Sequence, residues 1–440
     1  MPGQIRIPML YRVTIAAGIA VAFAGAPSHA STYTFNKLYS LCGKQDCADG
    51  QFPYSQPLDV GGTLYGTAAE GGKYHNDGVI FALTPKGKDY AYSAIYNFCK
   101  DPDCSDGATP VSDLIADTDG NLYGTAGLGG PNRSGVIFEL RKVAKKWKYK
   151  ILYFFCRVET CADGSKPTAG LSYKGQASGA AWNGNSPLFG ATSEGGANGN
   201  GVVFELKHNG SQWNYTNIHD VISGQLPNAP LVDTSGNLFI ASQGGGSHGG
   251  GNLYKLDAET WHETTIHNFC AEDNCTDGNQ PQGRLALDSS GNVFGVTFQG
   301  GAANGGVVFE HPTTGGYSVA YNFCSAANCA DGAAAVGLSL VGAGTFFGAT
   351  QGGGANNGGT IFKLTRKNGA FNESVVHDFC GKAKCADGVG PDSAPIQDKS
   401  GNLFGTTVEG GNTGQCPYGG GCGTVFELRN QSPFFGWTKA

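Results

Sequence analysis

Apolar and polar positions along this 440-residue chain alternate in short runs, and one order of runs returns seven times. A representative copy is Gly120–Thr125 (GNLYGT), then Gly129-Gly130, then Gly135–Leu140 (GVIFEL). Short runs of β-branched and aromatic residues, separated by turn residues, predict antiparallel strands. No stretch has a convincing helical period, so the pattern predicts an all-β fold.

Each repeat contains four predicted strands. In the copy from Pro110 to Cys156 the strands are expected at Val111–Ala116, Asn121–Ala126, Val136–Leu140 and Trp147–Phe155. The cysteine pairs that follow the fourth strands recur about every 57 residues, with one pair missing from the series. A four-stranded unit of this length, repeated seven times, predicts a seven-bladed β-propeller of four-stranded antiparallel blades rather than a solenoid.

The two ends of the chain predict how the ring closes. Tyr33–Leu41 has the pattern of a fourth strand with no three strands before it, and Thr424–Leu428 has the pattern of a third strand with no fourth after it. We therefore expect the N-terminal strand to complete the last blade and so to close the propeller. The aromatic tail Phe434–Trp437 competes for the same position in the sequence pattern.

Strand direction predicts where the loops lie. Because consecutive strands alternate in direction, the Gly-rich loop after the second strand and the Cys-containing loop after the fourth strand share one face of the disc, here named the Gly/Cys face. The short turns that begin Asp-x-x-Gly-Asn belong to the opposite face. Loops on a rigid scaffold carry function more often than the scaffold does, so a functional site is expected on the Gly/Cys face.

Residues 1–30 read as a targeting segment. Arg6 and Arg12 precede an apolar run, 13–26, and then Ser28-His29-Ala30, which predicts a signal peptide cleaved after Ala30 and a single propeller domain over 31–440. An uncleaved anchor is the alternative, although 14 residues are fewer than the ~20 that a membrane span needs. Cleavage changes the formal charge from −6 to −8, which argues against nucleic acid and anionic membranes as partners. The localisation that follows is secreted or periplasmic, of bacterial type.

All fourteen cysteines fall in close pairs, as expected of disulfides in an exported chain. Zinc is not expected, because four ligands would have to converge and the pairs belong to separate units. The bridges would stiffen loops rather than hold the fold together. The predicted pairs are Cys42/Cys47, Cys99/Cys104, Cys156/Cys161, Cys270/Cys275, Cys324/Cys329, Cys380/Cys385 and Cys416/Cys422.

The recurring Asp-Gly-Asn-Leu-Tyr-Gly-Thr, Gly-Gly and Gly-Val-Ile-Phe-Glu-Leu motifs resemble the GloVer, or choice-of-anchor, tandem-repeat family. The fourth-strand segment Ile95–Phe98, with Asp106-Gly107 and Pro110 after it, is similar to the rest of that unit. The resemblance covers residues 33–428 and implies an exported bacterial repeat protein with no assigned activity and no catalytic residues to transfer. This chain differs from the family in its Cys-x4-Cys loops, as in Cys99–Cys104, and no C-terminal anchor is expected for it.

An Asp-Gly pair follows the second cysteine of six loops, and around a ring these aspartates would form a circle of carboxylates on the Gly/Cys face. One interpretation is a site for a cation or polar ligand; the other, which we favour, is that each Asp caps its own turn before Gly. The fourth unit breaks the pattern, with Ser223-Gly224 instead of Asp-Gly and with His248 in its Gly-rich loop. The candidate ligand-binding residues are Asp49, Asp106, Asp163, Asp277, Asp331, Asp387 and His248.

Other motifs carry little chemistry. His219, His267 and His377 share a fourth-strand column with Tyr39, Tyr96, Tyr153 and Tyr321, which predicts a packing position. The Asp-x-x-Gly-Asn turns have too few oxygen ligands for a calcium loop, and Gly245–Gly249 fits a nucleophile elbow only in letters, without a strand-to-helix turn. We therefore expect no cofactor and no resident metal.

The sequence favours an exported binding or interaction scaffold over an enzyme, with a glycan or another exported protein as ligand. The alternative is a secreted carbohydrate-active hydrolase or lyase that uses carboxylates on the Gly/Cys face; a purely structural surface role is third. An enzyme should confine its carboxylates or histidines to two or three blades, whereas these columns are nearly uniform. A monomer is expected, and a ligand is expected to approach near the break in the fourth unit, close to Gln225 and His248.

Overall fold

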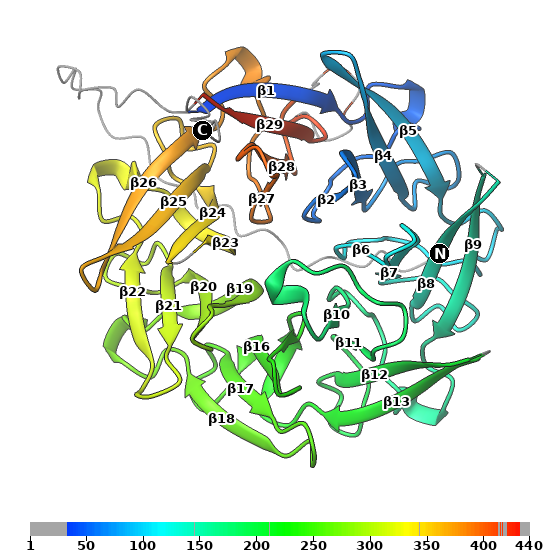
Figure 1. Ribbon diagram of the computed structural model, residues 1–440, viewed down its shortest axis with the longest axis horizontal. Coiled ribbons are helices and arrows are strands. Elements are labelled where there is room, and N and C mark those ends of the chain that lie inside the picture. The colour runs from blue at the N-terminus through cyan, green and yellow to red at the C-terminus, as the bar shows by residue number, and fades with distance from the viewer. Residues whose placement is uncertain are drawn as a thin grey trace, which may run out of the picture. The chain divides into compact units, whose positions relative to one another are not determined.

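The computed structural model describes residues 33–431 except 145, 211, 343, 412, 413, 415 and 417–419. Seven antiparallel sheets stand around one axis, and they form the predicted seven-bladed propeller (Figure 1). No α-helix occurs among the described residues; six short 3-10 turns are the only helical elements there. The predicted Phe434–Trp437 tail and residues 1–30 lie outside the described residues.

Each blade is numbered along the chain from the first complete set of strands. Blade 1 consists of β2 (Leu58–Val60), β3 (Thr63–Ala68), β4 (Val79–Lys86) and β5 (Asp89–Asn97). Blade 2 consists of β6 (Ile115–Ala116), β7 (Leu122–Ala126), β8 (Val136–Val143) and β9 (Lys146–Phe154). Blade 3 consists of β10 (Ser172–Tyr173), β11 (Leu188–Ala191), β12 (Val202–Asn209) and β13 (Gln212–Asp220). Blade 4 has five strands because its inner strand is interrupted: β14 (Gly224–Pro227), β15 (Leu231–Val232), β16 (Leu238–Gly245), β17 (Asn252–Leu256) and β18 (Glu263–Asn268).

The remaining blades complete the ring. Blade 5 consists of β19 (Asn279–Leu287), β20 (Val293–Gln299), β21 (Val307–His311) and β22 (Ser318–Asn322). Blade 6 consists of β23 (Ala333–Gly342), β24 (Thr345–Gly352), β25 (Thr360–Lys367) and β26 (Ala370–Asp378). Blade 7 consists of β27 (Ile396–Gln397), β28 (Leu403–Thr407), β29 (Thr424–Asn430) and, from the other end of the chain, β1 (Tyr33–Ser40).

The closure predicted from the sequence is confirmed. β1 pairs antiparallel with β29 from Tyr33–Asn430 to Ser40–Thr424, with one irregularity between Lys37 and Tyr39. The N-terminal strand therefore supplies the outer strand of blade 7. Hydrogen bonds between the strands, rather than a covalent link, join the two ends of the ring.

The innermost strand of blade 2 is shorter than predicted, with β6 covering only Ile115–Ala116 instead of Val111–Ala116. A side chain replaces part of the ladder: the Thr125 backbone N–H donates to Ser112 Oγ, and that hydroxyl donates to the Thr125 carbonyl, both at 3.1 Å. Thr125 Oγ1 in turn donates to the Ala169 carbonyl of blade 3 at 3.1 Å. Backbone groups near this strand are thus satisfied by hydroxyl groups rather than by a longer ladder.

The core lies between neighbouring blades, and one close approach in it repeats. A Cβ on Gly66 would lie 2.5 Å from Cζ of Phe81, and one on Gly190 would lie 2.4 Å from Cζ of Phe204. The phenyl ring of the third strand therefore requires glycine on the second strand. Blade 4 replaces this pair with Ile240 and Tyr254, and both side chains are fully buried.

Replacing Gly190 with alanine is expected to lower the free energy of unfolding by about 2–3 kcal/mol, because the added methyl overlaps a buried ring that cannot move without repacking. Urea denaturation of the mature chain measures this loss. Gly316→Ala is the control, since a Cβ there meets nothing within 4 Å, and its effect should stay within about 0.5 kcal/mol. Equal costs for the two variants would contradict the packing argument.

Candidate functional site

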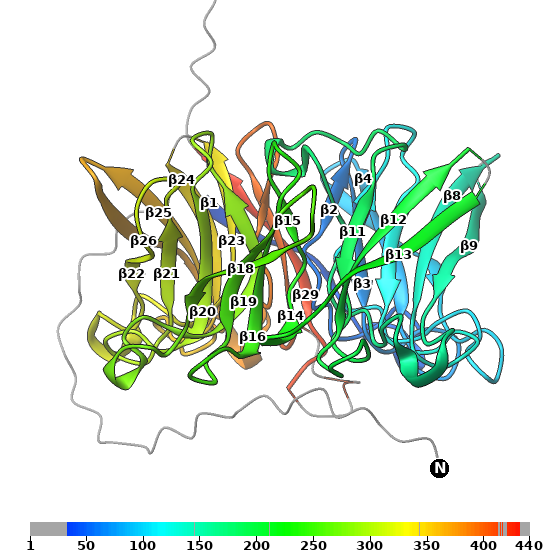
Figure 2. The same ribbon diagram turned by 90° about the horizontal axis from the view of Figure 1, so that it is seen from below.

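The Gly-rich and Cys-containing loops lie together, as strand direction predicted. The carbonyl oxygen of the second cysteine accepts the N–H of a glycine in the Gly-rich loop of the following blade, for example Gly72 to Cys47 at 2.9 Å and Gly130 to Cys104 at 2.8 Å. The same bond joins Cys161 to Gly196, Cys275 to Gly301, Cys329 to Gly354 and Cys385 to Gly411. Figure 2 shows these loops along one rim of the disc, opposite the β8–β9 and β12–β13 hairpin tips.

All fourteen cysteines form disulfides, and each bond joins the two members of a close pair, as predicted. Zinc was not expected because the cysteine pairs are far apart in sequence, but at one place two pairs come close in space. The sulfurs of Cys42, Cys47 and Cys422 lie within 4.8 Å of one another. These sulfurs are bonded in disulfides, so they offer no thiolate to a metal.

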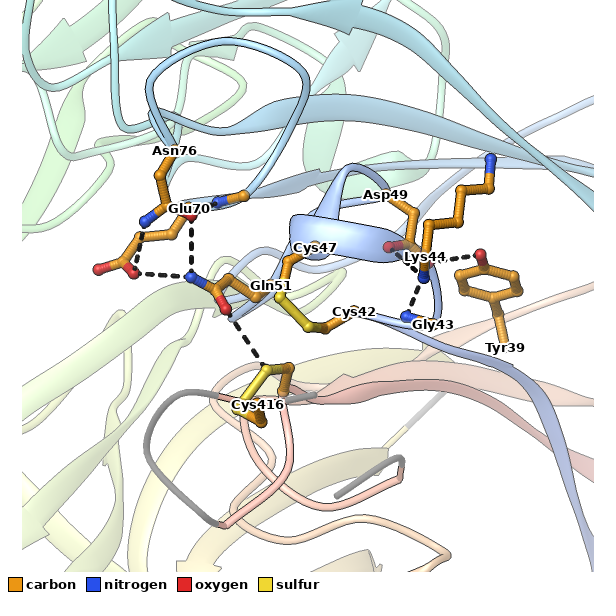
Figure 3. Close-up of a disulfide and its surroundings, with 12 residues drawn as sticks. Tyr39, Cys42, Gly43, Lys44, Cys47, Asp49, Gln51, Glu70, Asn76 and Cys416 are labelled. Carbon is orange, nitrogen blue, oxygen red and sulfur yellow. Dashed lines mark hydrogen bonds between the residues drawn. A yellow bond between two sulfur atoms is a disulfide. The ribbon is translucent and has the colours of Figure 1, made fainter. Parts of the chain in front are cut away.

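The six predicted aspartates each cap the Cys loop that they follow. Asp49 accepts the backbone N–H of Gly43 at 3.0 Å, that of Lys44 at 3.1 Å and the hydroxyl of Tyr39 at 2.6 Å (Figure 3). Equivalent backbone bonds reach Asp106, Asp163, Asp277, Asp331 and Asp387. Five of the six are buried, and Asp106 is half-buried.

These bonds match the turn-capping interpretation of the aspartates. The six carboxylates lie in six different contacts between blades, and no hydrogen bond among the described residues joins two of them. In a glycoside hydrolase, by contrast, two carboxyl groups about 5–10 Å apart flank the bond that is cleaved. The ligand-binding role assigned to the six aspartates remains a prediction.

The fourth-strand column packs the blades against each other, and we call each contact between consecutive blades a seam. In four seams the column residue stacks on a tyrosine of the next blade; the ring centroids lie 3.6–4.3 Å apart in Tyr39–Tyr92, Tyr96–Tyr149, Tyr153–Tyr215 and His267–Tyr317. Each of these outer tyrosines donates its hydroxyl to the carbonyl of the capping Asp at 2.5 Å. Each tyrosine therefore contacts the preceding blade through its ring and binds that blade's turn through its hydroxyl.

In seam 3–4 other residues replace both the capping aspartate and the tyrosine. Ser223 stands in the aspartate position, and Glu263 stands in the tyrosine position. Glu263 accepts the Ser223 hydroxyl at 2.7 Å and lies 2.8 Å from His219 Nε2. In this seam the carboxylate belongs to the neighbouring blade instead of the turn, and it contacts the fourth-strand column residue His219. Burial alone would raise the pKa of Glu263, but the bonds from His219 and Ser223 lower it below its ordinary value.

Seam 5–6 holds two carboxyl groups. Asp331 caps its turn and accepts the Tyr321 hydroxyl at 2.9 Å, and Glu373 stands in the tyrosine position beside it. Burial, and then the negative charge of Asp331, raise the pKa of Glu373 to about 8. Glu373 is therefore largely protonated at neutral pH.

Replacing Glu373 with glutamine is expected to stabilise the protein at high pH and to have little effect at low pH. The folded pKa lies above the unfolded one, so the stability that neutral Glu373 gives is fully present below about pH 4.5 and is lost as pH rises through about 8. The difference between Glu373→Gln and the parent chain should reach about 2–4 kcal/mol at pH 9. Chemical denaturation at pH 5, 7 and 9 measures it.

Glu263→Gln is the matched control with the opposite sign. The pKa of Glu263 is lowered in the fold, so its contribution is present above about pH 4.5 and is lost as pH falls through the folded pKa. Glu263→Gln should therefore destabilise the protein at pH 7 and have little effect on its stability in acid. If the stability of the two glutamine variants changed with pH in the same direction, the opposite pKa shifts of Glu373 and Glu263 would be refuted.

The missing Cys loop of seam 3–4 leaves a hollow. Eight positions separate His219 from Pro227, compared with 14 from His267 to Pro281 in the next unit. A depression of about 400 Å³ lies beside this short connection. Ile222 and Leu226, both on the short connection, are 65% and 39% exposed, and only Val143 and Val158 are also exposed among the large apolar side chains that the structure describes. The hollow is lined by Ala197, Asn198, Asn217, Ile218, His219, Asp220 and Ile222.

The predicted break in the fourth unit thus coincides with a concave surface. Gln225 is exposed on the short connection itself. His248 is exposed on the Gly-rich loop of blade 4, with Nδ1 2.9 Å from Ser247 Oγ, but it does not line the hollow. That loop adjoins the connection, because the Gly246 N–H donates to the Ser223 carbonyl at 2.5 Å.

Sequence reasoning missed a polar network that crosses the ring. Arg284 of blade 5 donates through Nε to Asp113 of blade 2 at 2.6 Å, and through Nη1 and Nη2 to Ser172 Oγ and the Leu171 carbonyl of blade 3, both at 3.2 Å. The Gln56 backbone N–H donates to the other Asp113 oxygen at 2.7 Å. The available signal was a charged residue on an inner strand, Asp113-Leu114 and Arg284-Leu285, where other units have Gly170-Leu171 and Gly337-Leu338.

Asp392 stands near this network. Gln351 Nε2 donates to Asp392 Oδ1 at 3.0 Å, and burial, followed by the charge of Asp113, raises the pKa of Asp392 to about 7. Gln56 Nε2 extends the connections to Ser339 Oγ of blade 6 at 3.0 Å and to the Ala394 carbonyl of blade 7 at 2.8 Å. Six of the seven blades are thus joined by side chains near the axis.

Comparison with known proteins gives the family of the repeat. The Gloeobacter/Verrucomicrobia repeat model matches residues 17–186 and 173–342. No curated protein matches the sequence. No helix among the residues described by the structure is long and apolar enough to cross a membrane.

Solved structures similar to this chain are distant. A chain of the nidogen/laminin complex is 12% identical, with a TM-score of 0.40, and the match covers 69% of this chain and 91% of that one. A protein from Lactobacillus plantarum is 12% identical, with a TM-score of 0.46 and coverage of 74% and 84%. A gluconolactonase from Xanthomonas campestris is 12% identical, with a TM-score of 0.39 and coverage of 85% and 96%.

Proposed function

The chain belongs to the Gloeobacter/Verrucomicrobia repeat family, and from that premise we propose that it is an exported scaffold that binds a protein partner at seam 3–4. The observation that carries the proposal is the hollow left where the Cys loop is missing. The other six seams carry the chain's own disulfide-bonded turn, whereas this seam lacks that turn and has Ile222 and Leu226 exposed.

The occupant proposed is a loop of another protein. In the other seams the chain's own loop occupies this position: its carbonyl oxygen accepts the N–H of a glycine, and the loop packs beside the fourth-strand column. In seam 3–4 the equivalent glycine N–H, that of Gly246, already donates to the Ser223 carbonyl, so a partner loop would pack on His219 and Ile222, which line the hollow. Exposed apolar side chains beside a preformed hollow supply the anchor that such contacts need.

Export supports the same proposal. The apolar run 13–26 with Arg6 and Arg12 before it fits a signal peptide, and disulfides persist in oxidising compartments. We propose cleavage after Ala30, a single propeller domain over 31–440, and a secreted or periplasmic location. N-terminal sequencing of the protein purified from culture medium and periplasm tests both the cleavage site and the compartment.

The docking proposal is tested with a peptide that copies the missing loop. A fluorescent, oxidised peptide with the sequence of residues 268–281, which contains Cys270 and Cys275, is titrated with the mature chain and followed by anisotropy. Saturable binding is expected, because the peptide carries the turn that the neighbouring seam accepts. Ile222→Asp should weaken it at least tenfold, since a charge would replace the exposed apolar anchor.

A loop graft is the matched control. Replacing residues 220–226 with the sequence of 268–280 restores the spacing of the other seams and should abolish peptide binding while leaving the fold intact by circular dichroism. Val158→Asp alters an apolar residue that is 50% exposed, compared with 65% for Ile222, on the Cys156–Cys161 loop, and it should not change binding. Equal binding by the parent chain, Ile222→Asp and the graft would refute the docking site.

A glycan is the second candidate ligand, because amide and carboxylate groups of Asn198, Asn217 and Asp220 line the hollow. A glycan array probed with the mature chain, with and without calcium, separates the two candidates. A hit that Asp220→Asn removes and Ile222→Asp retains would favour a glycan over a protein loop.

A further inference from the structure

Two disulfides lie close together where the ring closes. Cys42–Cys47 follows β1 near the start of the described chain, and Cys416–Cys422 precedes β29 near its end. The sulfurs of Cys42, Cys47 and Cys422 all lie within 4.8 Å of one another, and Figure 3 shows the Cys42–Cys47 disulfide with Cys416 below it. Within the described part of the chain, no other three sulfurs come this close together.

The backbone holds these two disulfides in place from both sides. The Leu41 N–H donates to the Gly423 carbonyl at 3.0 Å, and the Phe52 N–H donates to the Cys422 carbonyl at 3.0 Å. The four cysteines form a buried cluster with Phe52 packed against it, and they are at most 9% exposed. The contact between the disulfides is therefore part of the closed ring and is made by residues on both sides of seam 7–1.

We propose that these two disulfides exchange partners in the folded protein, so that Cys42 and Cys47 become bonded to Cys416 and Cys422. The exchange joins the two ends of the ring covalently, where hydrogen bonds between β1 and β29 otherwise hold them. The sulfurs of Cys42, Cys47 and Cys422 lie within 4.8 Å of one another and Cys416 belongs to the same buried cluster, so re-pairing requires rotation of the side chains and adjustment of the backbone around them. The local pairs form first during folding because their loops are short.

The exchange consumes no oxidant and no reductant. A catalytic thiolate, from a small thiol or a thiol oxidoreductase, attacks Cys416 Sγ, the most exposed of the four at 9%, and releases the Cys422 thiolate. The Cys422 thiolate attacks Cys47 Sγ, which forms the Cys47–Cys422 bond and releases the Cys42 thiolate. The Cys42 thiolate attacks Cys416 Sγ, which forms Cys42–Cys416 and returns the catalytic thiolate.

The two pairings restrict the unfolded chain differently. The local bonds close loops of a few residues, whereas a bond between Cys47 and Cys422 encloses nearly the whole propeller. In the chain-entropy model a longer closed loop removes more freedom from the unfolded state. The exchanged form should therefore unfold at a higher temperature than the form with local pairs.

The test is peptide mapping of the mature chain, 31–440, incubated in a mixture of reduced and oxidised glutathione. After acid quenching, alkylation and tryptic digestion without reduction, local pairing links peptides 38–44 and 45–73 and leaves 400–429 separate. Exchange links all three peptides in one species. We expect the three-peptide species to accumulate, together with faster migration of the unreduced, denatured chain on a gel.

Two double variants complete the test. Cys416→Ser with Cys422→Ser removes the exchange partner and should give neither the three-peptide species nor the gel shift. Cys99→Ser with Cys104→Ser removes a disulfide with the same sequence separation as Cys42–Cys47, 5, and should give both. Only local pairs at equilibrium in the parent chain would overturn the proposal, as would cross-links of Cys99 to distant cysteines in equal amount, which indicate scrambling through unfolding.

Discussion

A chain that begins at Leu41 is expected to lose the cooperative unfolding transition of the intact ring and to aggregate or self-associate. Its missing strand, β1, forms the outer edge of blade 7 and pairs with β29 along its whole length. Without it, β29 presents an unpaired edge of backbone N–H and C=O groups, which templates pairing with another chain. The blade that joins the two ends of the protein would be the one left incomplete.

β1 also connects three blades through its side chains. Tyr33 packs edge-on against Phe347 of blade 6, with ring centroids 6.0 Å apart, and Phe35 stacks on His377 of the same blade at 4.5 Å. Tyr39 stacks on Tyr92 of blade 1 at 4.3 Å and donates to Asp49. Losing three such aromatic contacts, at up to about 2 kcal/mol each, removes much of the 5–15 kcal/mol that stabilises a typical domain.

The experiment compares thermal unfolding and size-exclusion profiles of 31–440 and 41–440. A synthetic peptide of residues 31–41 added to 41–440 should restore the monomer peak and the transition, because the slot beside β29 is preformed. The matched control ends at Gln431 and lacks the aromatic tail; it should unfold like the parent chain, since β1 already occupies the slot. A well-folded monomer of 41–440 would show that ring closure does not depend on this strand.

The features that the sequence predicted are those that repeat. Each blade uses the same second strand, Gly-rich loop and third strand, so an error in one copy is corrected by the others. Closure by β1 was predictable because Tyr33–Leu41 and Thr424–Leu428 are the two incomplete copies. The shared Gly/Cys face followed from strand direction alone.

The features that the sequence did not predict occur once and connect distant residues. The loss of Asp at Ser223 was visible, but its replacement by the carboxylate of Glu263, 40 residues away, became apparent only when the strands were side by side. The inner strand of blade 2 was predicted too long because Ser112 replaces a ladder bond, and no periodicity records that substitution. Arg284 and Asp113 are 171 residues apart, and only ring closure brings them together.

Replacing Asp113 with asparagine is expected to lower the free energy of unfolding by about 3–5 kcal/mol, one of the largest effects of any single substitution in this chain. The carboxylate is 22% exposed and accepts bonds from Arg284 and from the Gln56 backbone, so the neutral amide leaves a half-buried guanidinium without its counter-charge. Because the pair spans blades 2 and 5, its loss weakens the contact across the ring rather than one hairpin. Equilibrium urea denaturation at pH 7 measures the change.

A double-mutant cycle separates the pair from its parts. Asp113→Asn combined with Arg284→Met should cost about 1–3 kcal/mol less than the sum of the single variants, since the second substitution removes the charge that the first left unpaired. Lys166→Ala is the control for an exposed ion pair, because Lys166 and Glu194 are 31% and 50% exposed, and it should cost less than about 1 kcal/mol. An Asp113→Asn cost no larger than that of Lys166→Ala would mean that the cross-ring pair does not hold the blades together, and that packing at the seams alone closes the propeller.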